Sequence, residues 1–353
     1  MSNLQNFQNM GTFDGGIIGA AGGTNAASIA NAMPIMDEAG IASGQAFLVS
    51  ELEKRDSLIR QPLSSITYPR DIPVSVGGGW VDYASAMGVS YGISGGSGEN
   101  SIIAGGANGL PVVQANTEKG LYKAHAFAAV LRVMFQDMQR ANYIGRSLDQ
   151  LLQQGMRLAY DKHMDENVYM GFPAYGTTGL LNNPEAMHTT VGGNSAARPS
   201  TKWSDKTPEQ ILQDTNSALL FVWAANEYDR EAIPNHVLLP YEQYAYILQT
   251  KVTELANKTI LDYLLENNVA AKEGGSLYIG ATAWAKGAGV GGTDRMTVYV
   301  NNERFLKVEE LVPLMRAMSQ PNVTNFCYDT AYAANISEVE LFYPTSLAYF
   351  DGI

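Results

Sequence analysis

The feature that most constrains how this chain folds is a glycine-rich stretch, residues 82–116, that contains no lysine or arginine. Strand-like apolar pieces lie within it at residues 87–93 and 110–113, which predicts a long two-stranded excursion. Ordering roughly 35 residues costs at least about 1 kcal/mol per residue. At about 25 cal/mol per Å² of apolar area, compensation requires more than about 1,000 Å² of burial, which a lone hairpin rarely finds on itself. We therefore expect other subunits to supply the missing contacts.

Composition argues against several classes of function. The 353-residue chain has 35 acidic and 23 basic side chains and a net charge of -12. This charge argues against a surface specialised for binding the phosphates of nucleic acids. Its single cysteine, Cys327, excludes an intramolecular disulfide and a cysteine-based zinc site, so we expect a small core residue in a reducing cytoplasm. The sequence has no run of about 18 apolar residues and no basic start before an apolar stretch. We expect neither a membrane span nor a classical export signal.

The N-terminal region is predicted to be an arm followed by a short helix. Residues 1–45 are rich in Gly, Ala, Asn and Ser and show neither a helical period nor strict alternation. Residues 45–61 place apolar side chains among charged ones, which suits an amphipathic helix ended by Pro62. Alternating apolar positions at 72–76 predict a strand, and the three glycines at 77–79 predict a hinge or bend.

The clearest helix begins at a capping box formed by Ser147 and Gln150. Apolar residues recur at helical spacing as far as Val168, and Gly171 with Pro173 end the segment. About 23 residues at 1.5 Å per residue span roughly 34 Å, which is longer than the common helix. This helix could serve as a backbone for the whole body.

A second region follows a Gly, Asn, Ser and Pro linker that ends near residue 204. Thr207 and Gln210 predict the capped start of a helix. The predicted elements beyond it are strands at 236–239, 276–284 and 295–300 and helices at 241–249 and 252–266. This alternation predicts a mixed α/β lobe. Residues 323–350 carry alternating apolar positions and many aromatics, which predicts strands that return to the first body.

Two glycine motifs are weak candidates for chemistry. Ser94 stands in a G-x-S-x-G pattern, but more glycines follow it instead of the helix that a nucleophile elbow needs. Residues 287–292 match G-x-G-x-x-G, but the following residues predict a strand, whereas dinucleotide binding requires a helix whose N-terminus faces the pyrophosphate. We interpret both matches as chance occurrences in glycine-rich loops.

The four histidines do not predict a metal or acid–base site. On a helix only residues three or four apart share a face, so His163 is left with Glu166, and a solvated or intersubunit polar patch is expected. His236 stands beside three apolar residues and is expected to be a satisfied core residue. We find no catalytic constellation, no metal site and no cofactor site, and we expect that the chain is not an enzyme.

The order of predicted elements resembles the capsid fold of the Hong Kong 97 type, found in tailed-bacteriophage major capsid proteins and in the related encapsulins. Two stretches carry the resemblance in detail. They are Arg157, Leu158, Ala159, Asp165, Glu166 and Gly171 late in the long helix, and then Gly176, Thr177, Thr178, Gly179, Leu180, Leu181 and Asn182. In those relatives a G-x-x-G-L-L-N-like segment connects the peripheral domain to the axial domain.

The resemblance implies an α+β fold with an N-terminal arm, an extended β-hairpin loop, a peripheral domain with a long spine helix and an α/β axial domain. The implied boundaries are 1–45 for the arm, 46–78 for the first part of the peripheral domain, 79–116 for the extended loop, 117–182 for the peripheral domain with the spine helix, 183–322 for the axial domain, and 323–353 for C-terminal strands returning to the peripheral domain. In the family the extended loop lies over an adjacent subunit, and axial domains meet at five-fold and six-fold vertices.

The implied function is a major capsid protein that self-assembles, as pentamers and hexamers, into the icosahedral head shell around the phage genome. Its partners would be separate scaffolding, portal and decoration proteins and double-stranded DNA bound without sequence specificity, with assembly in the host cytoplasm and no membrane. Candidate intersubunit contacts are Tyr83, Tyr91, Glu99, Arg157 and Asp294.

The sequence departs from some relatives in two ways. The extended loop has no lysine between residues 82 and 116, so autocatalytic crosslinking from this loop is not expected. The arm is too short and too glycine-rich to be a fused helical scaffold, so scaffolding would be a separate protein. Three alternatives stay open: an encapsulin-like nanocompartment, a serine hydrolase using Ser94, and another structural phage protein such as a tail or decoration subunit.

Overall fold

The computed structural model describes residues 65–94, 112–144, 148–193, 200–252 and 258–353. The chain divides into two units, Met1–Leu63 and Ser64–Ile353, and every described residue belongs to the second. The predicted arm, the predicted helix at 45–61 and the candidate contact Glu99 lie outside the described residues. No helix within these ranges is both long and apolar enough to cross a bilayer.

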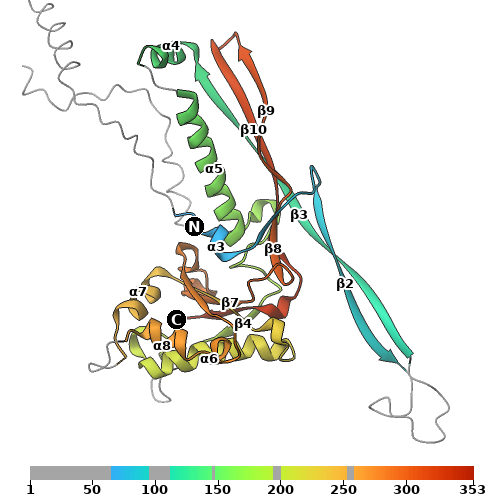
Figure 1. The fold of residues 1–353 in the computed structure, drawn as a ribbon, viewed down its shortest axis with the longest axis vertical. Coiled ribbons are helices and arrows are strands. Elements are labelled where there is room, and N and C mark those ends of the chain that lie inside the picture. The colour runs from blue at the N-terminus through green and yellow to red at the C-terminus, as the bar shows by residue number, and fades with distance from the viewer. Residues whose placement is uncertain (1–64, 95–111, 145–147, 194–199, 253–257) are drawn as a thin grey trace, which may run out of the picture. The chain divides into compact units, whose positions relative to one another are not determined.

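A four-stranded antiparallel sheet contains the longest strands. In sheet order they are β2 (Tyr83–Ser94), β3 (Val112–Met134), β10 (Cys327–Ser337) and β9 (Val312–Asn322). β3 pairs with β2 up to Lys123 and with β10 from Ala124 onward (Figure 1). The predicted two-stranded excursion is confirmed, but its second strand continues beyond residue 116. The charged residues that follow this position do not end the strand, because exposed strand positions accept charge.

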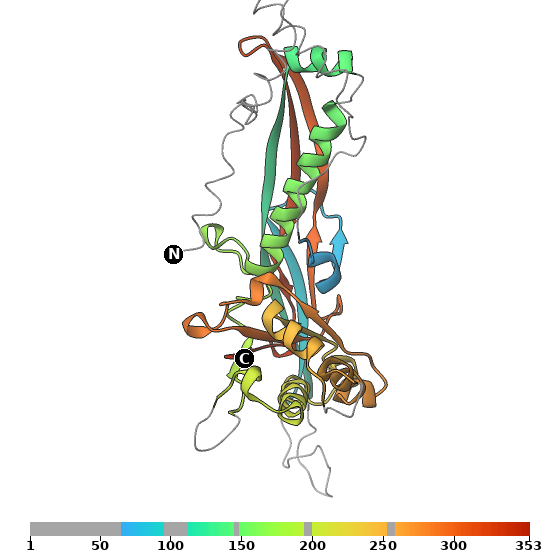
Figure 2. The same cartoon turned by 90° about the vertical axis from the view of Figure 1, so that its left-hand side faces the viewer.

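A long helix, α5 (Leu148–Met170), runs along this sheet, and α4 (Phe135–Ile144) precedes it (Figure 2). α5 has 23 residues, in agreement with the predicted length. Phe127 of β3 packs against Tyr160 of α5 with ring centroids 5.5 Å apart. The helix ends where Gly171 adopts a left-handed φ of 62°, so the predicted stop is confirmed. Ser147 of the predicted capping box lies outside the described residues.

A five-stranded mixed sheet forms the centre of the α/β lobe. Its strands, in sheet order, are β4 (Met187–Thr190), β12 (Leu347–Asp351), β7 (Arg295–Tyr299), β5 (His236–Leu239) and β6 (Tyr278–Ala281). Its helices are α6 (Pro208–Ala225), α7 (Tyr241–Gln249), α8 (Ile260–Glu266) and α9 (Val269–Lys272). The helix predicted at 252–266 is shorter, because Thr259 caps α8 and residues 253–257 lie outside the description.

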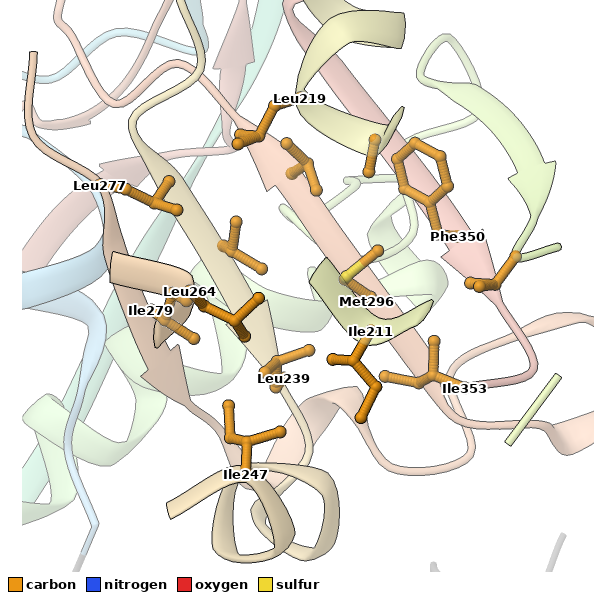
Figure 3. Close-up of a cluster of buried hydrophobic side chains, with 14 of the residues drawn as sticks. Ile211, Leu219, Leu239, Ile247, Leu264, Leu277, Ile279, Met296, Phe350 and Ile353 are labelled. Carbon is orange, nitrogen blue, oxygen red and sulfur yellow. The ribbon is translucent and has the colours of Figure 1, made fainter. Parts of the chain in front are cut away.

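Side chains from these helices and strands meet in one buried cluster (Figure 3). Ile211 of α6, Ile247 of α7 and Leu264 of α8 are fully buried there. The capping box predicted at the start of α6 is present, since Thr207 accepts from the Gln210 backbone and Gln210 accepts from the Thr207 backbone. The helix starts where the local sequence predicts, and its apolar face completes the core.

A three-stranded sheet of β1 (Val74–Val76), β8 (Leu306–Glu310) and β11 (Glu340–Leu341) lies next to the short helix α3 (Tyr68–Asp71). Single 3₁₀ turns occur at Pro173–Tyr175, Trp203–Asp205, Arg230–Ala232, Ala283–Ala285, Val290–Gly292 and Pro344–Ser346.

Strand pairing differs from the boundaries expected for the axial domain and the C-terminal return. β9, expected within the axial domain, pairs with β10 in the four-stranded sheet. β12, expected to return to the peripheral domain, pairs with β4 and β7 in the five-stranded sheet. Alternating apolar residues identify a strand, but they do not say which sheet it joins.

Candidate intersubunit surface

One face of the β2–β3 hairpin carries a stripe of exposed apolar side chains. Residues directly opposite each other in an antiparallel pair point to the same face, and Tyr83 pairs with Lys123 while Tyr91 pairs with Ala115. All odd-numbered residues of the two strands therefore share one face. The large apolar side chains on this face, each more than half exposed, are Tyr83, Met87, Val89, Tyr91, Val113 and Leu121. We call this set the hairpin stripe.

The opposite face of the hairpin is small or polar and turns toward the rest of the subunit at its root. Ala84 on that face is 7% exposed, and the Tyr122 hydroxyl donates a 2.7 Å hydrogen bond to the Leu341 carbonyl. The Tyr122 ring also meets Phe342 edge-on at 5.9 Å. The exposed apolar side chains of the hairpin stripe therefore lie on the face opposite the Tyr122 contacts, and large exposed apolar patches are typical of interaction sites.

A second exposed apolar surface lies on the four-stranded sheet, on the face opposite α5. Val130 of β3 is opposite Ala331, which is opposite Met318 of β9, so these residues share one face. Val130 and Met318 are 60% and 64% exposed, and Met315 lies on the same face. We call this surface the outer sheet face. Arg132 and Asp329 form an ion pair on it at 2.7 Å, which keeps the face from being wholly apolar.

Hydrogen bonds at the hairpin root hold it to the body. The Lys123 backbone N–H donates to Glu338 Oε1 at 2.7 Å, and the Glu338 N–H donates back to the Lys123 carbonyl at 2.9 Å. Glu338 also accepts from the Thr178 N–H through Oε2 at 3.1 Å. We call these bonds, together with the Tyr122 contacts to Leu341 and Phe342, the root clamp. The root clamp fixes the base of the hairpin to the rest of the subunit.

The predicted bend at 77–79 lies just before β2. All three glycines have positive φ values, of 129°, 127° and 82°, which side chains rarely adopt. A Cβ on Gly78 would also lie 2.6 Å from Leu311 Cδ2. Asn335 Nδ2 donates to the carbonyls of Gly79 and Val81, so the bend is fixed against β10.

Two buried carboxylates fix the entry of the chain into the body. Asp165 of α5 accepts from the Thr67 N–H at 2.9 Å, the Tyr68 N–H at 3.1 Å and Trp284 Nε1 at 2.8 Å. Asp71 of α3 accepts from the Tyr169 hydroxyl of α5 and forms a bidentate ion pair with Arg70. Every one of these bonds is charge-assisted, so the carboxylates serve as structural joints between α3, α5 and the α/β lobe.

The glycine motif behind the family resemblance is a close backbone crossing. A Cβ on Gly179 would lie 2.5 Å from the Tyr169 carbonyl carbon, and a Cβ on Gly171 would lie 2.7 Å from the Thr177 carbonyl oxygen. The backbone N–H groups of Leu180 and Leu181 donate to carbonyls in the last turn of α5, and both side chains are fully buried. The motif residues carry packing rather than chemistry.

The four predicted contact residues that the structure describes are not brought together. Tyr83 and Tyr91 are 57% and 76% exposed on the hairpin stripe, and Arg157 is exposed on α5. Asp294 accepts from Gln243 Nε2 at 2.7 Å and from the Gly287 N–H at 3.0 Å, so it orders the 287–293 loop within the subunit. The other members of the stripe are not among the residues that the sequence predicted as contacts, although their odd-numbered spacing is the signal that could have identified them.

The interpretation of His163 as part of a polar patch is wrong. Its ring lies 5.6 Å from the ring of His125 on β3 and stacks on Phe172 at 4.6 Å. Burial, and then the nearby His125, lower the pKa of His163 to about 4, and burial also lowers the pKa of His125. No group of three or more potential metal ligands occurs among the described residues. The pair is separated by 38 positions in the sequence, so local spacing could not reveal it.

The remaining motif predictions concern core residues and glycine loops. His236 bonds Asn235 at 3.1 Å and Asn301 at 2.9 Å, as expected of a satisfied core histidine, and Cys327 is buried. The 287–292 glycines lead into strand β7 rather than a helix, as predicted. Ser94 ends strand β2, and the residues after it lie outside the description.

Comparison with known proteins gives one family and a shared fold. A family model described as "Major capsid protein" matches residues 98–353. No curated protein matches the sequence.

Three solved structures illustrate the shared fold. The capsid of Myoviridae Phage XM1 is 17% identical with a TM-score of 0.69, and the match covers 86% of this chain and 98% of that one. The capsid of a native GTA particle is 11% identical with a TM-score of 0.59, covering 88% and 97%. The structure of Microbacterium phage Oxtober96 is 12% identical with a TM-score of 0.56, covering 87% and 98%.

Proposed function

The chain belongs to the major capsid protein family, and from this premise we propose that each copy lays its β2–β3 hairpin over a neighbouring copy to close a phage head shell. The protein is a structural component of a virion capsid and acts as a homo-oligomer. The family match favours this function over an encapsulin-like compartment and over a hydrolase.

The observation that carries the proposal is the hairpin stripe. Its six apolar side chains share one face, are each more than half exposed, and lie on the face opposite the Tyr122 contacts of the root clamp. Burying a large apolar side chain contributes about 1.5–3 kcal/mol. Several such side chains per copy, repeated around a closed shell, would sum to a stable assembly.

We propose the outer sheet face of an adjacent copy as the surface that receives the stripe. It presents Val130, Met315 and Met318, which match the stripe in apolar character. Methionine side chains adapt to irregular partners because they are unbranched and flexible. Tyr83 and Tyr91 would then be direct contacts, as the sequence predicts, whereas Arg157 and Asp294 would belong to other interfaces.

The finer assembly is proposed on the family resemblance. Axial lobes built on the five-stranded sheet would cluster as pentamers and hexamers. The expected domain boundaries, 183–322 and 323–353, would change so that β9 belongs to the four-stranded sheet and β12 to the axial lobe. Separate scaffolding, portal and decoration proteins would assist in the host cytoplasm. A net charge of -12 suits packaged DNA that is enclosed without being held tightly.

Assembly of the purified full-length chain tests the proposal. Light scattering after size exclusion, with negative-stain imaging, should show closed shells, or pentamers and hexamers that close when a scaffold is added. Replacing Met87 and Tyr91 together by serine should leave the subunit folded but prevent closed shells.

The matched control is Ser90→Ala, because Ser90 is exposed on the opposite face of the same strand. It should assemble like the parent. A parent chain that stays monomeric under every salt and scaffold condition would overturn the proposed function, and shells from the Met87 and Tyr91 double variant would remove the stripe from it.

A further inference from the structure

A buried carboxyl group lies beside the root clamp. Glu340 of β11 is 2% exposed, and no hydrogen-bond partner for its Oε1 atom occurs among the described residues. Its other oxygen lies 3.8 Å from Lys307 Nζ, which is an ion pair but too long for a hydrogen bond. A carboxylate in this position is poorly stabilised as an anion, because the loss of water outweighs the partial compensation from Lys307 and Ser337.

The cation beside Glu340 is shared with a second carboxylate. Lys307 also ion-pairs with Glu309, its neighbour on the same face of β8. The titratable and polar groups around the pair are Lys307 and Glu309 from β8, Ser337 at the end of β10, Glu338 directly after it, Tyr122 from β3 and Glu303 from the loop before β8. Burial, and then the Glu309 carboxylate, raise the pKa of Glu340 from 4.5 to about 7.

The strand that carries Glu340 is also the strand that holds the hairpin. β11 pairs with β8 through Glu340 and Leu341. Leu341 accepts the Tyr122 hydrogen bond, and Phe342 contacts the Tyr122 ring. Because β11 has only two residues, few backbone hydrogen bonds hold it to β8. A charge on Glu340 therefore weakens this pairing and, with it, the root clamp.

We propose that the proton on Glu340 controls the root clamp, so that protonated Glu340 keeps β11 paired and the hairpin held, whereas ionised Glu340 loosens both. The consequence for shell formation rests on the proposed function of the hairpin. The clamp itself is a property of a single subunit and can be measured without assembly.

The direction of the pH dependence follows from the proton affinity. The folded carboxyl keeps its proton up to a pKa of about 7, whereas an exposed glutamate releases it near 4.5. The clamp therefore loses stability as the pH rises from about 4.5 through about 7, and it is firmest on the acid side.

Hydrogen exchange on the unassembled full-length chain, at a concentration where scattering detects no shells, tests the proposal. Peptides covering residues 119–126 and 336–345 report on the clamp, after correction for the intrinsic pH dependence of exchange. In the parent chain, protection should be about tenfold lower at pH 8 than at pH 6, as a group titrating near 7 predicts. Glu340→Gln, which stays neutral, should show equal protection at both pH values.

Two further variants keep the outcome decisive. Glu309→Gln frees Lys307 for Glu340 and should shift the loss of protection to lower pH, so the difference between pH 6 and pH 8 shrinks. Glu273→Gln, at an exposed position after α9, should keep the parent profile. Equal protection in the parent at both pH values, or an unshifted profile in Glu309→Gln, would overturn the proposal. A pH-dependent clamp in a chain that never assembles would instead count against the proposed function.

Discussion

The odd-numbered side chains of β3 all lie on one face of the strand, but the two halves of that face differ. Among the described elements, a helix covers only the second half, where β3 pairs with β10, and not the first half, where it pairs with β2. In the second half Phe127 packs against α5 and Leu131 is 7% exposed. In the first half Val113 and Leu121 are 66% and 60% exposed. One strand thus contributes to a core at one end and presents an apolar surface at the other. The difference indicates that the hairpin half is built for contact with another molecule.

The largest expected effect is on the covered half. Leu131→Ala should lower the free energy of unfolding of the unassembled chain by about 2–3 kcal/mol, because truncating this buried side chain leaves a cavity. Val130→Ala, one position away on the exposed outer sheet face, should change it by less than about 0.5 kcal/mol. Urea unfolding monitored by circular dichroism measures both. Similar losses in the two variants would mean that the faces do not differ as described.

The boundary between the halves depends on Glu338. Glu338→Ala removes the acceptor for the Lys123 and Thr178 N–H groups and should cost about 2 kcal/mol, since part-buried donors are left without a partner. Glu338→Gln retains one acceptor oxygen and should lose clearly less. Thermal unfolding compares them, with hydrogen exchange at Lys123 as a local readout. If the two variants behave alike, the two bonds do not hold the root.

Acid should destabilise the packing of α5 on the second half of β3. His163 is neutral when folded, with a pKa of about 4, whereas an unfolded histidine takes up a proton as the pH falls through 6.5. Stability therefore falls between pH 6.5 and 4, by about 1–2 kcal/mol after allowance for solvent screening. Comparing unfolding midpoints at pH 7 and 4.5 should show a smaller loss in His163→Phe than in the parent.

The exposed His188 provides the matched control for the acid effect. His188→Gln should keep the parent's pH dependence, because His188 lies on β4 away from the α5 contact. The parent profile also contains the opposite trend of Glu340, so the informative quantity is the difference between variant and parent. An unchanged loss in His163→Phe would show that this pair does not limit the covered half at low pH.

The smallest effect on stability is expected on the exposed half. Tyr91→Ala should change the free energy of unfolding of the unassembled chain by less than about 0.5 kcal/mol, because the side chain is 76% exposed. The same change should reduce the yield of closed shells measured by light scattering. Destabilisation as large as that of Leu131→Ala would indicate that the stripe is covered within its own subunit.

Local features were the most predictable from the sequence. Gly171 stops α5 because glycine accepts a left-handed backbone, and Thr207 with Gln210 caps α6 because neighbouring side chains satisfy its free N–H groups. The hairpin was predictable as a glycine-rich, strand-flanked stretch. The sheet in which each later strand lies was not, since β9 and β12 have similar alternating patterns but pair with partners that are distant in sequence.

The sequence by itself determined where α5 ends, where α6 begins and that a long hairpin exists, because each of these depends on residues a few positions apart. The tertiary structure alone decided that α5 covers one half of one face of β3, that His163 meets His125, and that Glu340 is buried beside the root clamp. Those outcomes depend on contacts between segments far apart in the chain, and such contacts form only when the whole fold brings the segments together.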